Sequence, residues 1–176
     1  MNFFLRLLGA AGLAATLLAQ PSRAQEISEA TLAQHILLVQ AVEDRGVDFV
    51  FNHPFCQRKG LQGFYDGQVL GVCLGPTGEI TENDLDTIRH EAHHMVQDCL
   101  GDGKADYQFE GDGSMYPNAY ELALHAGLPL DTLTRIRMAY SHLDERDFLM
   151  EVEAFYVAHA INPLQIAEAI NTLCSR

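Results

Sequence analysis

Basic residues are scarce in this chain of 176 residues, which has 11 lysines and arginines against 24 aspartates and glutamates and a formal net charge of −13. A protein with this balance repels polyanions, because its field opposes the phosphate charges of nucleic acid and of anionic lipid headgroups. We therefore expect neither nucleic acid nor an anionic membrane surface to be a partner.

The chain also lacks an apolar run of the roughly 20 residues that a transmembrane helix needs. Its longest such stretch, Leu7 to Ala19, follows one positive charge and precedes a Ser-Arg-Ala sequence. This order is typical of a cleaved secretory signal. We predict a signal peptide at 1–24, a single mature domain at 25–176, and export to the periplasm or the medium without stable membrane association. An uncleaved anchor is the alternative.

No two cysteines are spaced as CxxC, the pair typical of structural zinc sites. All four cysteines lie in the predicted mature part, and an even number in an exported chain is typical of two disulfides. Three pairings are possible. The one with the shortest first loop joins Cys56 to Cys73 and Cys99 to Cys174, and we take it as the prediction.

The first part of the mature chain is predicted to contain one helix and a few strands. Ser28 to Asp44 has the periodicity of an amphipathic helix, and the sequence VDFVF at 47–51 alternates as a strand does. Two further runs rich in β-formers meet at Asp66-Gly67, a dipeptide typical of tight hairpins. We expect a small antiparallel sheet in this region.

Helices are predicted for most of the remainder. A capping box at Thr81 opens a helix that Gly101 closes. The stretch 101–113 is rich in Gly and Asp and is predicted to be a solvated loop, because its spacing does not match a calcium-binding EF-hand. About four helices follow, with breaks at 127–129, near Asp144 and at 162–163. Strands first and helices afterwards predict an α+β fold, a small sheet packed on a mainly helical domain.

The sequence HEAHH, residues 90–94, lies in the middle of the helix that Thr81 opens. On a helical wheel, His90 and His94 are one turn apart and point away from the apolar stripe. HExxH uses this spacing to present two imidazoles to one zinc ion, with the intervening Glu91 as general base beside the open coordination position. His93 falls about a quarter turn away, and we expect it to be exposed or to support a ligand. A solvated helix face without metal is the alternative.

A third ligand has to come from another part of the chain, because catalytic zinc usually has three protein ligands and one water. The helix predicted at 148–161 is apolar around most of its circumference, so its two glutamates, Glu151 and Glu153, should be buried and should need partners. By residue type either could bind metal. A salt-bridged glutamate without metal is the alternative.

HEAHH together with Glu151-Val152-Glu153-Ala154 resembles the gluzincin branch of zinc metallopeptidases, in which HExxH is completed by the first Glu of an ExxA pattern. The likeness spans roughly residues 46–161, and its two short motifs are the specific part. It implies a zincin-like domain in which His90, His94 and Glu151 bind Zn²⁺. One departure is Phe155, where many relatives have Asp or Asn to orient a zinc-bound histidine, so that support has to come from elsewhere.

The resemblance implies an exported zinc-dependent metallopeptidase that hydrolyses peptide or protein substrates with a metal-activated water. Glu91 would accept the proton of that water, and a second donor would stabilise the oxyanion. By residue type the candidates for this donor are Tyr116, Tyr120, His125, Tyr140, His142, Tyr156 and His159. The alternative is a catalytically inactive metal-binding or protein-binding module on a peptidase-like scaffold. No oligomeric state is predicted.

Overall fold

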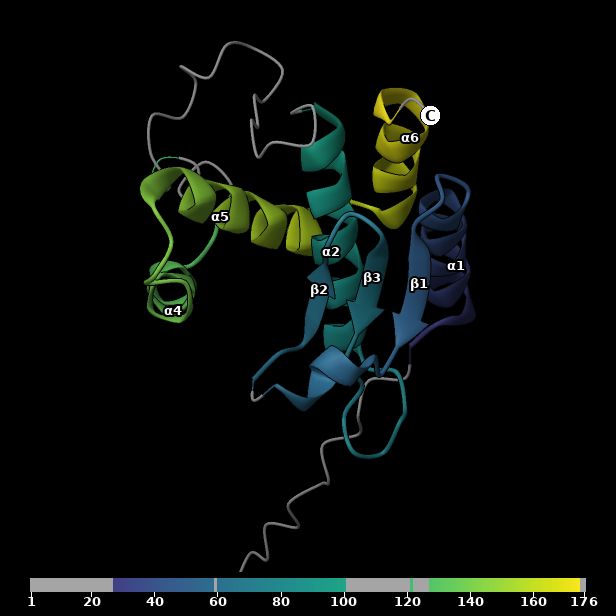
Figure 1. Cartoon of the computed structure of the whole chain (residues 1–176), viewed down its shortest axis with the longest axis horizontal. Coiled ribbons are helices and arrows are strands. Elements are labelled where there is room, and N and C mark those ends of the chain that lie inside the picture. Colours follow the sequence, from purple (N-terminus) through teal and green to yellow (C-terminus); the bar gives the residue numbers. More distant parts are fainter. Residues whose placement is uncertain (1–26, 59, 101–120, 122–126, 175–176) are drawn as a thin grey trace, which may run out of the picture.

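The computed structural model describes residues 27–58, 60–100, 121 and 127–174, which form an α+β arrangement of helices and one small sheet (Figure 1). The predicted fold class is therefore confirmed. The predicted signal peptide, 1–24, and the predicted loop at 101–113 lie outside the described residues. In chain order the elements are α1 (Glu29–Glu43), β1 (Asp48–Phe51), the short 3-10 helix η1 (Pro54–Gln57), β2 (Gly63–Tyr65), β3 (Val69–Val72), α2 (Glu82–Leu100), α4 (Leu130–Ala139), α5 (Glu145–Ala160) and α6 (Pro163–Leu173).

The sheet is mixed, with strand order β1-β3-β2. β2 and β3 form the predicted antiparallel hairpin, in which Gly67 has a φ of 88° and the Asp66 carboxylate accepts from the backbone of Gln68 and Val69. β1 runs parallel to β3, so the expectation of a wholly antiparallel sheet is wrong in this pair. The reason is the strand order. The hairpin turns the chain back, so that β3 lies between β2 and β1 and runs in the same direction as β1.

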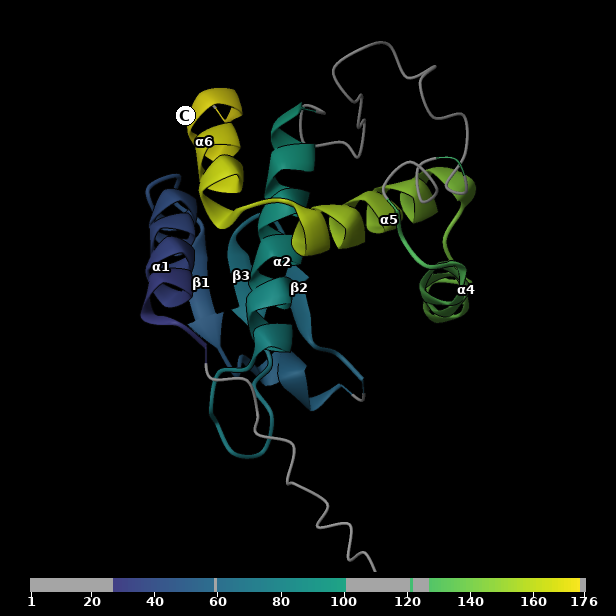
Figure 2. The ribbon, with the colours of Figure 1, turned by 180° about the vertical axis from the view of Figure 1, so that it is seen from behind.

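The helix that carries HEAHH, α2, lies between the sheet and two other helices, and it contacts β2, β3, α5 and α6 (Figure 2). It begins with the predicted capping box: the Thr81 hydroxyl accepts from the Asp84 amide, and the Asp84 carboxylate accepts from the Thr81 amide at 2.8 Å. Its predicted apolar stripe belongs to the main core. The buried members of that stripe are Leu85, Ile88, Ala92, Met95 and Val96.

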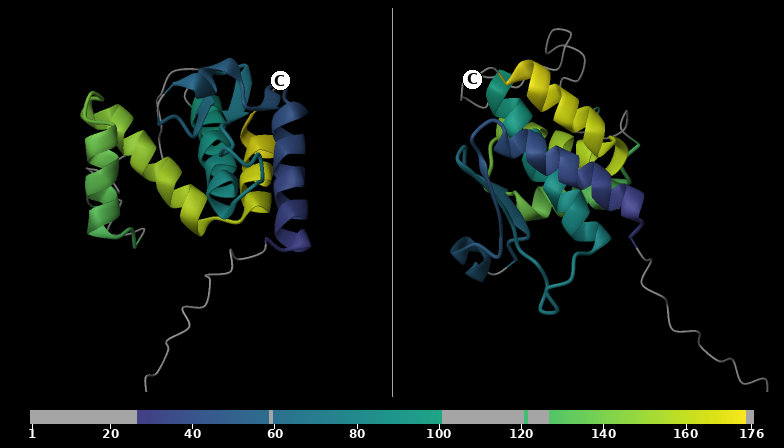
Figure 3. Two further views of the ribbon diagram at one scale, coloured as in Figure 1. Left: turned by 90° about the horizontal axis from the view of Figure 1, so that it is seen from below. Right: turned by 90° about the vertical axis from the view of Figure 1, so that its right-hand side faces the viewer.

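Two of the three breaks predicted in the C-terminal part, near Asp144 and at 162–163, are confirmed by helix caps. Asp144 caps α5 by accepting from the Asp147 amide, and Asn162 opens α6 in a capping box with Gln165. A small second core joins α4 to α5 through Leu133, Ile136, Phe148 and Val152. As a result α4 and α1 lie at opposite ends of the molecule, with α2 between them (Figure 3).

Both disulfides have the predicted pairing. Cys56 and Cys73 join η1 to the end of β3, and Cys99 and Cys174 join the end of α2 to the residue after α6. Two disulfides suggest an oxidising, exported environment, because thiols in the cytosol are kept reduced. Among the described residues, no helix is both long and apolar enough to cross a membrane.

Candidate metal centre

Two helices bring three potential metal ligands together. His90 and His94 on α2 and Glu151 on α5 each offer one nitrogen or oxygen atom, and these atoms lie within 4.8 Å of one another. We call these three residues the HHE group. The two Nε2 atoms are 3.1 Å apart, Glu151 Oε2 is 3.3 Å from His90 Nε2, and Glu151 Oε1 is 3.7 Å from His94 Nε2.

These separations fit a small tetrahedral ion. With metal–ligand bonds of about 2.0–2.1 Å, two ligands of a tetrahedral zinc ion lie about 3.3 Å apart. Two imidazoles and one carboxylate are also a donor set that zinc takes in catalytic sites, where a fourth position stays open. The residues of the HHE group therefore fit a divalent ion by chemistry and by distance.

The helix face that carries the two histidines is covered. The side chains of His90, His94 and Glu151 are 9%, 18% and 17% exposed, because α5 packs across this side of α2. The alternative of a solvated helix face is therefore wrong.

The HHE group is largely buried, and it has little positive charge to offset the carboxylate of Glu151. Glu151 Oε2 is buried and has no hydrogen-bond partner among the described residues, although two imidazole nitrogens lie nearby. Burial, followed by the charge of His90, lowers the pKa of His94 to about 4. Burial alone would raise the pKa of Glu151, but the neighbouring His90, His94 and Tyr140 bring it below its ordinary value. A neutral imidazole at His94 and an ionised carboxylate at Glu151 are the protonation states that metal binding requires of these two residues.

Glu91 is buried beside the HHE group, beneath strand β2. Burial is the main reason that its pKa is raised to about 7; nearby His90 opposes this rise and Glu151 adds to it. β2 can approach this closely because residue 63 is glycine: a Cβ atom there would lie 2.9 Å from Glu91 Oε1 and still closer to the Thr87 methyl. No sequence pattern pointed to Gly63, since its role depends on a contact between two distant elements.

Glu153 and His93 pair with each other and lie apart from the HHE group. Glu153 is 1% exposed, and its Oε1 is 2.8 Å from His93 Nε2. The structure thus brings Glu151, and not Glu153, to the paired histidines. The expectation that His93 could be exposed is wrong, because it is buried in the same interface between α2 and α5.

Of the predicted oxyanion donors, Tyr140 reaches the HHE group, and its hydroxyl hydrogen-bonds to Glu151. Burial first, and then the charge of Glu151, raises the pKa of Tyr140. His142 and His159 are exposed, and Tyr156 packs into the cores. Tyr116, Tyr120 and His125 lie outside the described residues.

Phe155 occupies the position at which relatives of the resembled family have a polar residue. Its ring centre lies 4.5 Å from that of His90, and His90 Nδ1 is buried without a hydrogen-bond partner among the described residues. On its Nδ1 side, His90 is therefore supported by ring packing in place of a hydrogen bond to a described residue.

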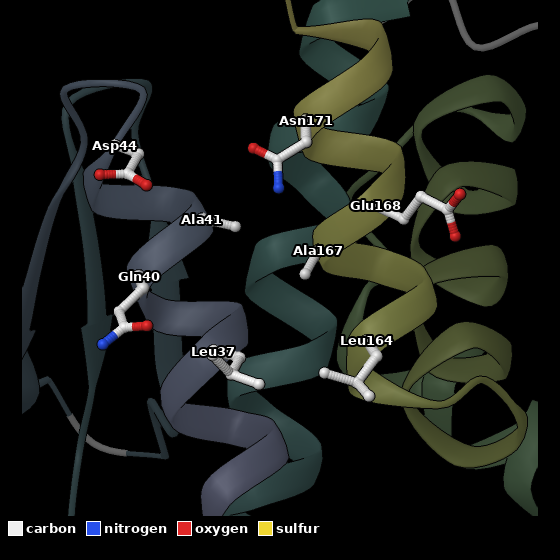
Figure 4. A pocket seen from close by; sticks show the side chains of 8 residues that line it. All are labelled: Leu37, Gln40, Ala41, Asp44, Leu164, Ala167, Glu168 and Asn171. Carbon is white, nitrogen blue, oxygen red and sulfur yellow. The ribbon is translucent and has the colours of Figure 1, made fainter.

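A surface groove lies elsewhere, between α1 and α6 (Figure 4). It is lined by Leu37, Gln40, Ala41, Asp44, Leu164, Ala167, Glu168 and Asn171. It has no histidine or cysteine, and neither of its helices carries a residue of the HHE group.

Comparison with protein-family models, with curated proteins and with solved structures finds no match to this chain.

Proposed function

We propose that this protein is an exported zinc-dependent metallopeptidase in which the HHE group binds the metal. One observation carries the proposal: two imidazole nitrogens and the carboxylate oxygens of a largely buried glutamate face one another at 3.1–3.7 Å. Two imidazole nitrogens and a carboxylate oxygen at these separations can all bind one divalent cation, whose charge would offset that of the buried carboxylate. The resemblance of HEAHH and the later ExxA pattern to gluzincins supports zinc as that cation.

The neighbouring side chains suit hydrolysis. When bound, zinc would lower the pKa of a coordinated water toward about 7 and would polarise a carbonyl group. Glu91 would accept the proton of this water, because it is one residue from His90 and is buried beside Glu151. Tyr140 would donate a hydrogen bond to the developing oxyanion, since its contact with Glu151 places the hydroxyl beside the HHE group.

A peptide substrate has a strand to pair with. β2 is at one edge of the sheet, and Gly63 in this strand lies against Glu91. An extended peptide that adds to this edge would place its backbone beside Glu91 and the HHE group. Two disulfides and the predicted signal peptide are consistent with a substrate outside the cytosol.

A metal-binding or protein-binding module without catalysis is the second candidate. His90 Nδ1 favours it: this nitrogen has no acceptor among the described residues, and a zinc-bound histidine whose other ring nitrogen lacks an acceptor binds the metal more weakly. The two candidates differ in whether Glu91 is needed for turnover.

Cleavage of a peptide library by the zinc-loaded mature protein distinguishes them. We expect Glu91→Gln to bind zinc and to cut at least about 100-fold more slowly, because it keeps the shape of the side chain and cannot accept a proton. Glu79→Gln, an exposed change, is the matched control. Equal cleavage by Glu91→Gln would remove Glu91 from the mechanism. Zinc binding without cleavage by the parent would favour the non-catalytic module.

A further inference from the structure

Two buried polar side chains lie behind His94 and have no part in the proposed chemistry. Gln97 on α2 is 0% exposed and Glu153 on α5 is 1% exposed. Burying an amide and a carboxylate costs free energy unless hydrogen bonds inside the protein replace those to water. The inference below rests on the proposed metal site, because it assigns these residues a role toward one ligand of that site.

The hydrogen bonds of Gln97 fix which end of its amide faces His94. Gln97 Nε2 donates to the Met150 carbonyl oxygen at 3.1 Å and to Glu153 Oε2 at 3.0 Å. The Met150 carbonyl can only accept, so the amide nitrogen has to be on that side. Gln97 Oε1 is then the atom that lies 2.7 Å from His94 Nδ1.

This orientation decides the tautomer of His94. An amide oxygen can only accept, so Nδ1 has to carry the proton that it donates to Gln97. In the neutral ring Nε2 then has the free lone pair, and Nε2 is the atom that faces His90 and Glu151. A lone pair directed at the other two ligands is what metal binding requires.

We infer that Gln97 and Glu153 are positioning residues, which hold His94 as the Nδ1–H tautomer with Nε2 ready to bind metal. Glu153 acts through Gln97, and Gln97 acts through His94. This pair supports His94, whereas Phe155 packs against the other histidine of the site, His90. The pair gives no such support to His90, since His90 Nδ1 has no partner among the described residues.

The tautomer can be measured in the metal-free parent by long-range ¹H–¹⁵N NMR on histidine-labelled protein, at a pH where the ring is neutral. We expect the signals of His94 to be those of a protonated Nδ1 and an unprotonated Nε2. A protonated Nε2 as the main form would overturn the inference. This readout needs no metal, so it decides the role of Gln97 even if the parent binds no zinc, a result that would overturn the proposed function instead.

Zinc affinity tests whether this positioning of His94 matters for metal binding. In competition with a chromogenic chelator we expect Gln97→Met, which keeps the bulk of the side chain, to bind zinc about 10–100-fold more weakly than the parent. Val96→Ala is the matched control, because it weakens the packing of the same helix from the core side. Folded Gln97→Met with parental affinity, or an equal loss in Val96→Ala, would overturn the inference. If Gln97→Met fails to fold, the tautomer measured in the parent decides.

Discussion

Glu151 and Glu153 are two residues apart on the same helix and have different partners. Residues two apart on a helix point in directions about 200° apart, so these two cannot serve the same site. Glu151 faces the paired histidines, and Glu153 faces His93 and Gln97. Residue type alone left both open as ligands, and the family resemblance favoured the one that the structure brings to the histidines.

Removing the charge of Glu151 should impair zinc binding directly. We expect Glu151→Gln to weaken zinc affinity by more than the roughly 10–100-fold that is typical of a supporting residue, because a ligand itself is lost. Competition titration with a chelator measures this. Glu145→Gln, an exposed change on the same helix, should leave the affinity unchanged. If both variants bind zinc as the parent does, Glu151 is not a ligand.

Sequence reasoning found His90 and His94 because HExxH is a spacing within one helix, and it favoured Glu151 through the family resemblance. It did not find Gln97 or Gly63, whose roles depend on contacts with α5 and α2 that no local pattern encodes. It also left open whether His93 is exposed or supports a ligand, since a helical wheel shows which residues share a face but not which neighbouring element covers it. The residues whose roles the sequence did not reveal are therefore those that depend on tertiary contacts.

At the scale of elements, the fit between β2 and α2 sets the depth of Glu91. Glycine at 63 lets the strand approach the helix, and a methyl group there would collide with Thr87 and Glu91. We expect Gly63→Ala to lower the free energy of unfolding by about 1–3 kcal/mol, as overpacking does, and to slow peptide cleavage. Urea unfolding and a cleavage assay measure the two effects.

Gly75→Ala is the matched control for this change. A Cβ atom at Gly75 meets no atom within 4 Å and its φ is not in the left-handed region, so stability and cleavage should stay close to those of the parent. If Gly63→Ala were as harmless as Gly75→Ala, the close contact between β2 and α2 would not constrain Glu91.

Arg89 joins three helices, α1, α2 and α5. It donates to His35 Nε2 at 3.1 Å and to the Ala158 carbonyl oxygen, and it pairs with Asp86. His35 is buried, and its Nδ1 donates to the Thr31 carbonyl oxygen at 2.8 Å. This network needs a neutral His35, because Nε2 accepts from a guanidinium.

Stability should therefore fall in mild acid. Burial is the main cause that lowers the pKa of His35, the Thr31 carbonyl opposes it, and the charge of Arg89 adds to it. A pKa lowered on folding stabilises the protein above the ordinary histidine value of about 6.5, and this stability is lost as the pH falls through the folded value. We expect the free energy of unfolding to decline less between about pH 7.5 and pH 5 in His35→Gln than in the parent. Equal declines in urea titrations would exclude His35 as the cause.

At the scale of the whole molecule, the two disulfides close loops of different length. Cys56–Cys73 spans 17 residues, whereas Cys99–Cys174 spans 75 and fixes the end of α2 to the C-terminal helix. In the chain-entropy model the longer loop stabilises the fold by about 1 kcal/mol more than the shorter one. We therefore expect the two disulfides to contribute unequally to the free energy of unfolding.

Replacing each pair with serine tests this difference. We expect the loss of Cys99–Cys174 to lower the free energy of unfolding by about 2–5 kcal/mol, and the loss of Cys56–Cys73 to lower it by less. Urea unfolding of the two double variants gives both values. A larger loss for the Cys56–Cys73 variant would contradict the prediction.

The α+β class, the hairpin and the helix caps were predictable from the sequence, because each depends on local spacing or on composition. The disulfide pairing was chosen from three possibilities by the length of its first loop alone, although Cys99–Cys174 joins residues 75 apart. The parallel pairing of β1 with β3 was not predictable from the sequence. It depends on the order of the strands in the sheet, which is set by the path of the chain between strands that lie close in sequence. The arrangement of α5 across α2, which assembles the HHE group, was accessible only through the family resemblance.

The location of bound zinc tests the proposed site most directly. Crystals of the mature protein grown with equimolar zinc should give one anomalous peak at the zinc edge, about 2.0–2.1 Å from the Nε2 atoms of His90 and His94 and from a carboxylate oxygen of Glu151. A peak bound by other residues, or the absence of any peak between these three side chains, would contradict the proposal.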